Sequence, residues 1–234
     1  MLTRSRGVDV STGQGLDAAL AGADAVIDVT NVTTTSRRRS VAFFIAATEH
    51  LLSAGQRTGV GHHVALSIVG IDRVDFGYYE GKRVQEELVL AGPVPASVLR
   101  ATQFHEFAGQ VLARSRGPVA LVPRMLVQPV AAREVAGALV TLATGPAVGL
   151  APELAGPHVH ELVDLARELA AVSGQRRPLV PVRLPGATGR AMASGGLLPT
   201  GPGPRGQQAF AAWLAATGGR VSAGPTGATG PGQG

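Results

Sequence analysis

The fold is decided by a short apolar stretch, Ala25-Val26-Ile27-Asp28-Val29, which predicts a buried strand. Two similar stretches follow, His63-Val64-Ala65-Leu66-Ser67 and Ser97-Val98-Leu99-Arg100-Ala101. Segments with a helical period alternate with these strands. Helices are expected over residues 15–21, 36–55, 78–90 and 103–114, and Ser36 is the expected N-cap of the second helix. Strands this apolar, in strict alternation with helices, predict a parallel α/β sheet that helices cover on both faces.

The second half of the chain continues the alternation with shorter elements. Strands are expected at Leu126-Val127-Gln128, at residues 152–155 and at Val180-Pro181-Val182, and helices at residues 132–143, 160–172 and 208–216. Residues 184–206 are rich in Gly and Pro, which predicts a long loop. From Gly218 onward the same residue types continue without an apolar period, which predicts a disordered tail.

Composition excludes several classes of protein. Of the 234 residues 45% are hydrophobic, which is enough to build a buried core. The chain has no Cys, which excludes a disulfide framework, a thiolate zinc site and a Cys nucleophile, and which fits the cytoplasm as the expected location. No apolar run reaches the ~20 residues that a membrane-spanning helix needs. The N-terminus has no apolar segment behind its charges, so no secretory signal is expected.

The net charge of +5 is spread along the chain. Its one dense basic run is Arg37-Arg38-Arg39, and no basic stripe is interleaved with aromatic residues, which argues against a nucleic-acid partner. This run is better explained as a solvated face than as a phosphate clamp, because cations at a helix N-terminus oppose the helix dipole. Among 21 basic residues only Lys82 is a lysine, which marks a position where a compact ammonium is needed.

Three residues predict a catalytic site. Tyr78 and Lys82 are four residues apart at the start of a helix, so their side chains share one face, and Ser67 closes the preceding strand. An ammonium beside the phenol would lower the pKa of Tyr78 and make it a general acid or base for carbonyl–alcohol interconversion. The Ser67 hydroxyl would donate to the developing oxyanion. In the alternative, Tyr78 is an ordinary half-buried aromatic and Lys82 a solvated helix residue.

Other candidates carry weaker signals. Tyr79 and Arg83 form a competing pair one residue later, but a planar guanidinium is a poorer substitute for a point charge. His105 and Glu106 face either a substrate pocket or solvent. Ser67 lacks the G-x-S-x-G elbow of hydrolases. No metal site is expected, because an H-E-x-x-H pattern is absent around His62, His63, His158 and His160.

A set of segments occurs in order and resembles one family. These segments are Gly7-Val8-Asp9-Val10-Ser11-Thr12-Gly13-Gln14-Gly15-Leu16, Val26-Ile27-Asp28-Val29-Thr30-Asn31, His62-His63-Val64-Ala65-Leu66-Ser67-Ile68-Val69-Gly70, Gly77-Tyr78-Tyr79-Glu80-Gly81-Lys82, Leu99-Arg100-Ala101-Thr102-Gln103-Phe104, Gln128-Pro129-Val130-Ala131-Ala132-Arg133-Glu134-Val135-Ala136 and Glu153-Leu154-Ala155-Gly156-Pro157. Over residues 2–216 the chain resembles the NmrA-like, atypical branch of the NAD(P)-binding short-chain dehydrogenase/reductase superfamily.

The resemblance implies a set of cofactor-binding residues. Arg4 and Arg6 would read a 2′-phosphate, which suggests NADP, with NAD as the alternative; otherwise they form an exposed, frayed terminus. Lys82 would also hold the nicotinamide ribose. The remaining positions that match the family pattern are Asp9 and Val10 beside the adenine, Val29, Thr30 and Asn31 beside the adenosine ribose, and Thr102, Gln103 and Phe104 beside the nicotinamide and substrate. In the alternative, Asp9 is an ordinary turn residue.

The chain departs from the family at its beginning. The resemblance implies a Rossmann-like, doubly wound parallel sheet that lacks the first strand, the first helix and most of the second strand, with a small C-terminal substrate lobe. Gly7, Gly13 and Gly15 follow no apolar strand, so they do not form the phosphate-binding G-x-G-x-x-G fingerprint. In the family's strand order the missing strands would leave a slot in the sheet. We interpret this either as a start site set too late or as a remnant that binds dinucleotide poorly.

The expected organisation is therefore an incomplete NAD(P)-binding domain in residues 1–125, substrate-lobe elements in residues 126–217 and a tail in residues 218–234. The expected function is that of an NAD(P)-dependent oxidoreductase acting on a small carbonyl or alcohol. Two alternatives stay open: a non-catalytic NAD(P)-sensing regulator and a truncated, inactive remnant. The expected partner is a small-molecule substrate, and the sequence leaves the oligomeric state open.

Overall fold

The computed structural model describes residues 7–115 and 117–218. Its central sheet contains four strands that all pair in parallel, in the spatial order β1 (Ala25–Asp28), β2 (His62–Ile68), β3 (Ala96–Ala101) and β6 (Gly149–Leu150). The structure confirms the expected α/β fold with a parallel central sheet. The first three strands lie where the apolar stretches predicted them.

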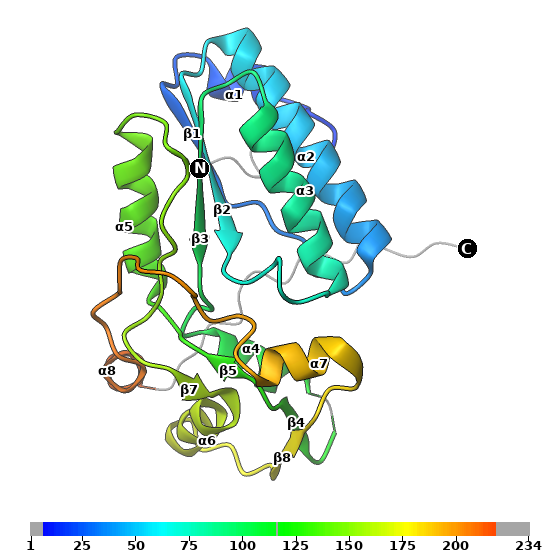
Figure 1. The fold of residues 1–234 in the computed structure, drawn as a ribbon, viewed down its shortest axis with the longest axis vertical. Helices are drawn as coiled ribbons and strands as arrows, with labels where there is room; N and C mark the ends of the chain where they lie inside the picture. The colour runs from blue at the N-terminus through cyan, green and yellow to red at the C-terminus, as the bar shows by residue number, and fades with distance from the viewer. Residues whose placement is uncertain (1–6, 116, 219–234) are drawn as a thin grey trace.

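Helices cover both faces of this sheet. Helices α2 (Arg37–Thr58) and α3 (Gly77–Ala91) lie side by side on one face, and α5 (Ala132–Ala143) lies on the other (Figure 1). The Ser36 side chain accepts a hydrogen bond from the Arg39 N–H, which confirms the predicted N-cap of α2. The short helix α1 (Leu16–Leu20) packs against α2.

The alternation along the strands decides which side chains lie beneath α3. Ala65 of β2 packs against Val89 of α3, so its side of the sheet is the α3 face. The register pairs Ala65 with Asp28 of β1. His63 and Ser67 lie two residues on either side of Ala65, and residues two apart in a strand point to the same face. The sheet therefore places an acid, a histidine and a serine on the α3 face.

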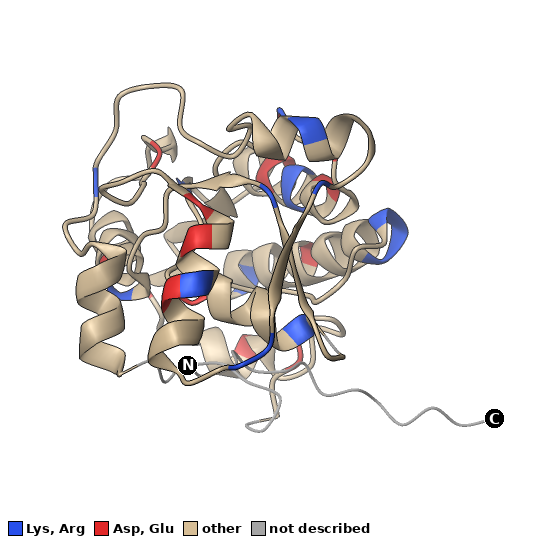
Figure 2. Cartoon of the chain, turned by 90° about the horizontal axis from the view of Figure 1, so that it is seen from below, with Lys and Arg blue, Asp and Glu red and all other residues tan. Residues whose placement is uncertain are grey.

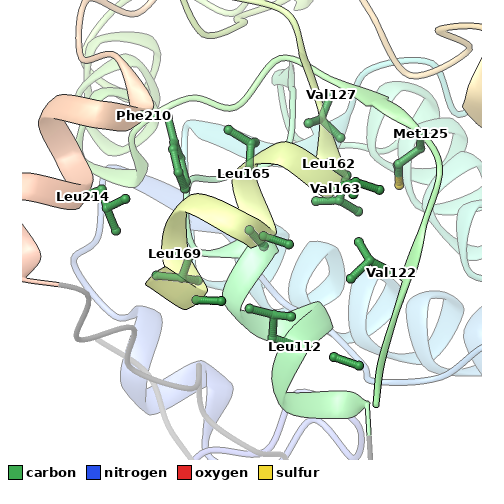
Figure 3. Packing of buried hydrophobic residues seen from close by; sticks show 14 of the residues in the cluster. Leu112, Val122, Met125, Val127, Leu162, Val163, Leu165, Leu169, Phe210 and Leu214 are labelled. Carbon is green, nitrogen blue, oxygen red and sulfur yellow. The ribbon is translucent and has the colours of Figure 1, made fainter. Parts of the chain in front are cut away.

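A second hydrophobic core lies at the carboxyl end of the central strands, around α6 (Leu162–Val172) (Figure 1). Figure 3 shows side chains of α6 packed with Leu112 of α4 and with Phe210 and Leu214 of α8. The other elements of this region are α4 (Phe107–Arg114), the parallel pair β4 (Ala120–Pro123) and β8 (Leu179–Val182), the antiparallel pair β5 (Leu126–Val127) and β7 (His160–Glu161), α7 (Gly186–Ala193) and α8 (Phe210–Thr217).

The chain passes between the two cores more than once. Leu112 and Val122, from α4 and β4, belong to the second core, whereas α5 and β6 return to the central sheet. A boundary after residue 125 stays a prediction. The expected tail beyond Gly218 lies in residues 219–234, outside the described part of the chain.

Two expectations about the sheet are wrong. The expected slot is absent, because β1 pairs directly with β2, with Ala25 opposite His62, so the backbone groups of β2 that face β1 find partners. Residues 152–155 do not form a strand: the sheet pairs with β6 instead, and Leu154 and Ala155 make isolated bridges. Pro152 has no N–H to give to a ladder.

Two expectations about helices need correction. The region 184–206 contains α7, whose Met192 is buried in the second core, so burial there outweighs the low helix propensity of its glycines. The helix expected over residues 103–114 begins only at Phe107. Before it, Phe104 forms a parallel bridge with Val130, which holds residues 102–104 extended. Over the described residues, none of the helices is sufficiently long and apolar to cross a membrane.

Candidate active site

The carboxyl ends of β1, β2 and β3 lie at one edge of the sheet, and the N-terminus of α3 lies beside them (Figure 1). At this edge the Tyr78 hydroxyl donates a hydrogen bond of 2.7 Å to Oδ1 of Asn31, which comes three residues after β1. Open parallel sheets bind their ligands at this edge. The structure thus brings together two of the residues that the sequence singled out.

The position of Tyr78 is fixed by close packing of α2 on α3. The Ser40 hydroxyl donates to the backbone carbonyl of Tyr78 at 2.9 Å. The approach is possible because residue 81 is glycine: a Cβ there would lie 2.6 Å from a ring carbon of Phe44. The Tyr78 ring meets the Phe44 ring edge to face, with centroids 5.9 Å apart.

Lys82 shares this face of α3 with Tyr78, as the spacing predicts. Its Nζ lies 4.8 Å from the centroid of the same Phe44 ring. The ammonium is buried, and it donates to the Leu66 carbonyl at 2.6 Å and to Oε1 of Gln85. No hydrogen bond joins it to Tyr78 among the described residues, because these two acceptors hold it against β2.

Gln85 connects Lys82 to a buried acid. Its Nε2 donates to Oδ2 of Asp28 at 2.8 Å, and the second oxygen of Asp28 accepts the Thr30 N–H at 2.8 Å. Thr30 precedes Asn31, so hydrogen bonds lead from Lys82 through Gln85 and Asp28 to the turn that receives the Tyr78 hydroxyl. His63 adds a further group, with Nε2 3.7 Å from Oδ2 of Asp28.

Burial and charge act in opposite directions on the two buried ions. Burial by itself would raise the pKa of the Asp28 carboxyl, but His63, Lys82 and the Thr30 N–H lower it to about 2. Burial lowers the pKa of Lys82 to about 8, and the carboxylates of Asp28 and Glu86 limit this fall. Asp28 is therefore ionised at neutral pH and supports the charge of Lys82.

The expected effect of Lys82 on Tyr78 is wrong. Burial raises the pKa of Tyr78 to about 12 rather than lowering it, because the desolvated phenolate is the less stable form. The pKa of Tyr79 is raised as well, by burial and by Tyr78. At neutral pH Tyr78 is a protonated phenol, and its hydroxyl is a hydrogen-bond donor.

Three polar side chains near the same edge have unmet hydrogen-bonding capacity. Buried atoms of Thr30, Ser67 and Gln103 (Oγ1, Oγ, and both amide atoms) have no partner. Each lies at or just after the end of a neighbouring strand: Thr30 follows β1, Ser67 is near the end of β2 and Gln103 follows β3. Buried polar groups normally have partners, so these three fit a polar ligand such as a dinucleotide.

The remaining predicted residues lie in several places. Arg4 and Arg6 are outside the described residues. Asp9 and Val10 form a tight turn. The Val10 carbonyl contacts Nδ1 of His50 at 2.9 Å, far along α2 from the end that lies near Tyr78. The structure does not bring this turn together with Asn31 and Tyr78.

Val29 is exposed beside the site, and the Thr102 hydroxyl is already used, since it donates to the Gln128 carbonyl at 2.5 Å. Phe104 packs in the cluster around α5. The competing pair is separated, because Tyr79 packs on the second core and Arg83 contacts the Ile71 carbonyl and Glu80.

His105 is buried against Phe210 and Trp213, with Nε2 3.0 Å from the Gln208 carbonyl. Its environment is that of the second core rather than of the edge with Tyr78. Within residues 7–115 and 117–218, no three His, Asp or Glu side chains are grouped so that they could hold a metal ion.

The sequence did not single out Asp28, His63 and Gln85 as site residues. Two signals could have found them. A carboxylate inside an otherwise apolar strand, as at Asp28, needs a buried partner. Gln85 stands three residues after the only lysine, which is the spacing of neighbours on one helix face.

No protein-family model matches the sequence, and no curated protein is similar to it. Solved structures are similar in fold. A short-chain dehydrogenase/reductase superfamily protein from Agrobacterium tumefaciens, solved with bound NAD, is 18% identical with a TM-score of 0.63, over 90% of this chain and 83% of that one.

A dTDP-glucose 4,6-dehydratase from Streptomyces venezuelae, solved with NAD, is 15% identical with a TM-score of 0.66, over 90% of this chain and 76% of that one. An NADPH-dependent quinone oxidoreductase from Escherichia coli is 16% identical with a TM-score of 0.63, over 89% and 80%. At these identities the likeness shows the fold, which is Rossmann-like.

Proposed function

We propose that this protein is an NAD(P)-dependent oxidoreductase of the atypical short-chain dehydrogenase/reductase type, which reduces a small carbonyl compound at the carboxyl edge of β1, β2 and β3. The observation that carries the proposal is the hydrogen bond between Tyr78 and Asn31 at this edge, one helical turn from the only lysine. NADP is the proposed cofactor because Arg4 and Arg6 match the family's 2′-phosphate positions.

The residues at the edge fit a nicotinamide dinucleotide. Thr30, Ser67 and Gln103 offer polar atoms without partners, and the similar structures from A. tumefaciens and S. venezuelae contain NAD. When bound, the cofactor supplies or accepts a hydride. Thr30 would contact the adenosine ribose, Lys82 the nicotinamide ribose, and Gln103 the nicotinamide and substrate. Asn31, which the resemblance assigns to the adenosine ribose, accepts the Tyr78 hydroxyl and would lie with it at the substrate.

Tyr78 acts as the general acid. Its raised pKa of about 12 keeps the phenol protonated at neutral pH, so it donates its proton to the carbonyl oxygen as that oxygen becomes an alkoxide. The alkoxide is the stronger base, so this transfer is favourable. Ser67 donates a hydrogen bond to the same oxygen. This protonation state favours reduction over oxidation at neutral pH.

The test is to compare two neighbouring tyrosines. Tyr78→Phe should bind NADPH with unchanged affinity in a fluorescence titration but lose ~10²-fold or more of its turnover over a panel of aldehydes, ketones and quinones. Tyr79→Phe is the matched control, and it should retain turnover because Tyr79 packs on the second core. Equal turnover in Tyr78→Phe and the wild type would overturn the assignment.

A second candidate is a regulator that binds the dinucleotide without turnover. It is favoured by one observation: the ammonium of Lys82 is held by the Leu66 carbonyl and Gln85 and makes no hydrogen bond to Tyr78 among the described residues. Binding of NADPH without turnover of any panel compound would support it. If neither NADPH nor NADH binds, both proposals are wrong.

A further inference from the structure

A cavity of about 370 Å³ lies in the second part of the molecule, away from the candidate active site. Three of the residues that line it are arginines, Arg124, Arg183 and Arg190, and they outnumber the one carboxylate in its wall, Glu161. We call this cavity the arginine pocket. Its size is that of a site for a small molecule.

The backbone holds two of these arginines side by side. The parallel strands β4 and β8 end with Pro123 opposite Val182, and the Arg124 N–H donates to the Val182 carbonyl at 2.8 Å. Arg124 and Arg183 are thus the next residues on two paired strands. The Cβ atoms of neighbouring residues on paired strands are ~5 Å apart, so the side chains of Arg124 and Arg183 leave the backbone next to each other.

Helix α7 brings the third arginine against them. Gly189 allows the helix to approach the chain that leaves β8, since a Cβ there would lie 2.5 Å from the carbonyl carbon of Leu184. Met192 anchors the helix in the second core, and the Thr188 hydroxyl donates to the Asp75 carbonyl at 2.6 Å. Arg190 therefore stands on a docked helix, and the pocket is formed before any ligand arrives.

The charge in the arginine pocket is not neutralised from within. Basic and acidic residues are interspersed over the chain (Figure 2), and five arginines elsewhere have carboxylate partners, such as Arg57 with Asp17 and Arg100 with Glu86, both at 2.6 Å. Others, such as Arg133, have none within the described part of the chain, so what sets the pocket apart is that three arginines without ion pairs line one cavity. Arg124, Arg183 and Arg190 make no ion pair with any residue that the structure describes, and Glu161 is not within ion-pair distance of them.

We propose that the arginine pocket binds a small oxyanion with at least two negative charges. Guanidinium groups are planar forks that match the oxygens of phosphoryl and carboxylate groups in pairs, and a bound anion relieves the repulsion among three like charges. The proposal does not depend on the dinucleotide site, because the pocket lies between β4, β8 and α7, on other elements than β1, β2 and α3.

The test is calorimetric titration of the full chain with pyrophosphate and, separately, with succinate, in the absence of dinucleotide. At least one of them should bind. Arg183→Gln should weaken that binding tenfold or more, and raising the salt from 50 to 300 mM should weaken it as well. The matched control is Arg133→Gln, an exposed arginine on α5 outside the pocket, which should bind as the wild type does.

The two anions distinguish between two chemical classes of ligand. Binding of pyrophosphate alone identifies a phosphoryl ligand, and binding of succinate alone identifies a dicarboxylate. Two results would overturn the proposal: no binding of either anion, or equal binding by the wild type and Arg183→Gln, which would put the anion at another site. Because Arg183 is exposed, its substitution should leave the thermal unfolding midpoint within a few degrees of the wild type's, which shows that the variant is folded.

Discussion

Beneath α3 the interior of the protein is polar, with Asp28, Lys82 and Gln85 all buried and joined by hydrogen bonds. Around α6 the packed side chains are mainly apolar, including Leu162 and Phe210 (Figure 3), with His105 buried beside Phe210. In that second region Arg124, Arg183 and Arg190 are exposed and line the arginine pocket. Charge is thus buried and hydrogen-bonded beneath α3, whereas around α6 it lies at the surface, in an ion pair between Asp164 and Arg167 and, among the described residues, without ion pairs at the pocket.

This difference shows what each core does. An apolar core stabilises the protein by removing apolar surface from water. Buried charges, in contrast, are expensive to desolvate and add little net stability. The groups beneath α3 hold Lys82 and the Asn31 turn in fixed positions. We infer that this polar core serves the geometry of the candidate active site and that the apolar core serves the stability of the second region.

The largest effect should come from removing the buried carboxylate. Asp28→Asn leaves Glu86 as the carboxylate that still supports the buried charge of Lys82, and it should lower the free energy of unfolding by ~3–5 kcal/mol in urea denaturation. Asp164→Asn, which breaks the exposed pair with Arg167, should cost less than ~1 kcal/mol. Equal costs would contradict the paired interior beneath α3.

Asp28→Asn should also change how the stability of the protein depends on low pH. The folded-state pKa of Asp28 is about 2, below its ordinary value of 3.8, so the unfolded chain binds this proton first. The stability that Asp28 contributes is therefore complete above pH 3.8 and lost as the pH falls toward 2. Asp28→Asn should flatten this acid limb in denaturation curves from pH 5 to 2, and an unchanged slope would contradict the shift.

The apolar core should respond without a pH dependence of its own. Leu162→Ala removes a fully buried side chain and should cost ~2–4 kcal/mol at any pH at which the protein is folded. Leu90→Ala, on the exposed face of α3, is the control and should cost far less, because Leu90 is 46% exposed. A small effect at Leu162 would mean that the second core is loosely packed.

A smaller effect is expected where α2 approaches α3. Gly81→Ala places a Cβ against Phe44 and should cost ~1–3 kcal/mol by overpacking. Gly137→Ala in α5 has no atom within 4 Å of the new Cβ, so it should stabilise the helix by ~0.5–1 kcal/mol. A lower midpoint of thermal unfolding for Gly81→Ala and a higher one for Gly137→Ala would support the close approach of α2 and α3 that positions Tyr78. A higher midpoint for both variants would contradict it.

Much of the fold was predictable from local pattern. Apolar stretches located β1, β2 and β3, and the period of 3.6 located α2, α3 and α5. The expectations that are wrong depend on distant contacts. Helix α7 is rich in small residues and is stabilised by burial of Met192, and β6 pairs with β3 although the sequence favoured residues 152–155.

The candidate site was predictable in its residue types but not in its electrostatics. The four-residue spacing placed Tyr78 and Lys82 on one face, yet the pKa of Tyr78 depends on burial by Phe44 and its neighbours, which no spacing reveals. The carboxylate that supports Lys82 is also non-local, because Asp28 lies 57 residues before Gln85 and meets it only where α3 packs on the sheet.

The most direct test follows the only lysine of the chain by NMR. With lysine labelled at its side-chain carbons, Lys82 gives a single set of signals, which can be titrated from pH 6 to 11 with and without NADPH. We expect a pKa of about 8 that moves when NADPH binds beside the ammonium. A pKa at the ordinary value of 10.5, with no response to NADPH, would contradict both the burial of Lys82 and the proposed cofactor site.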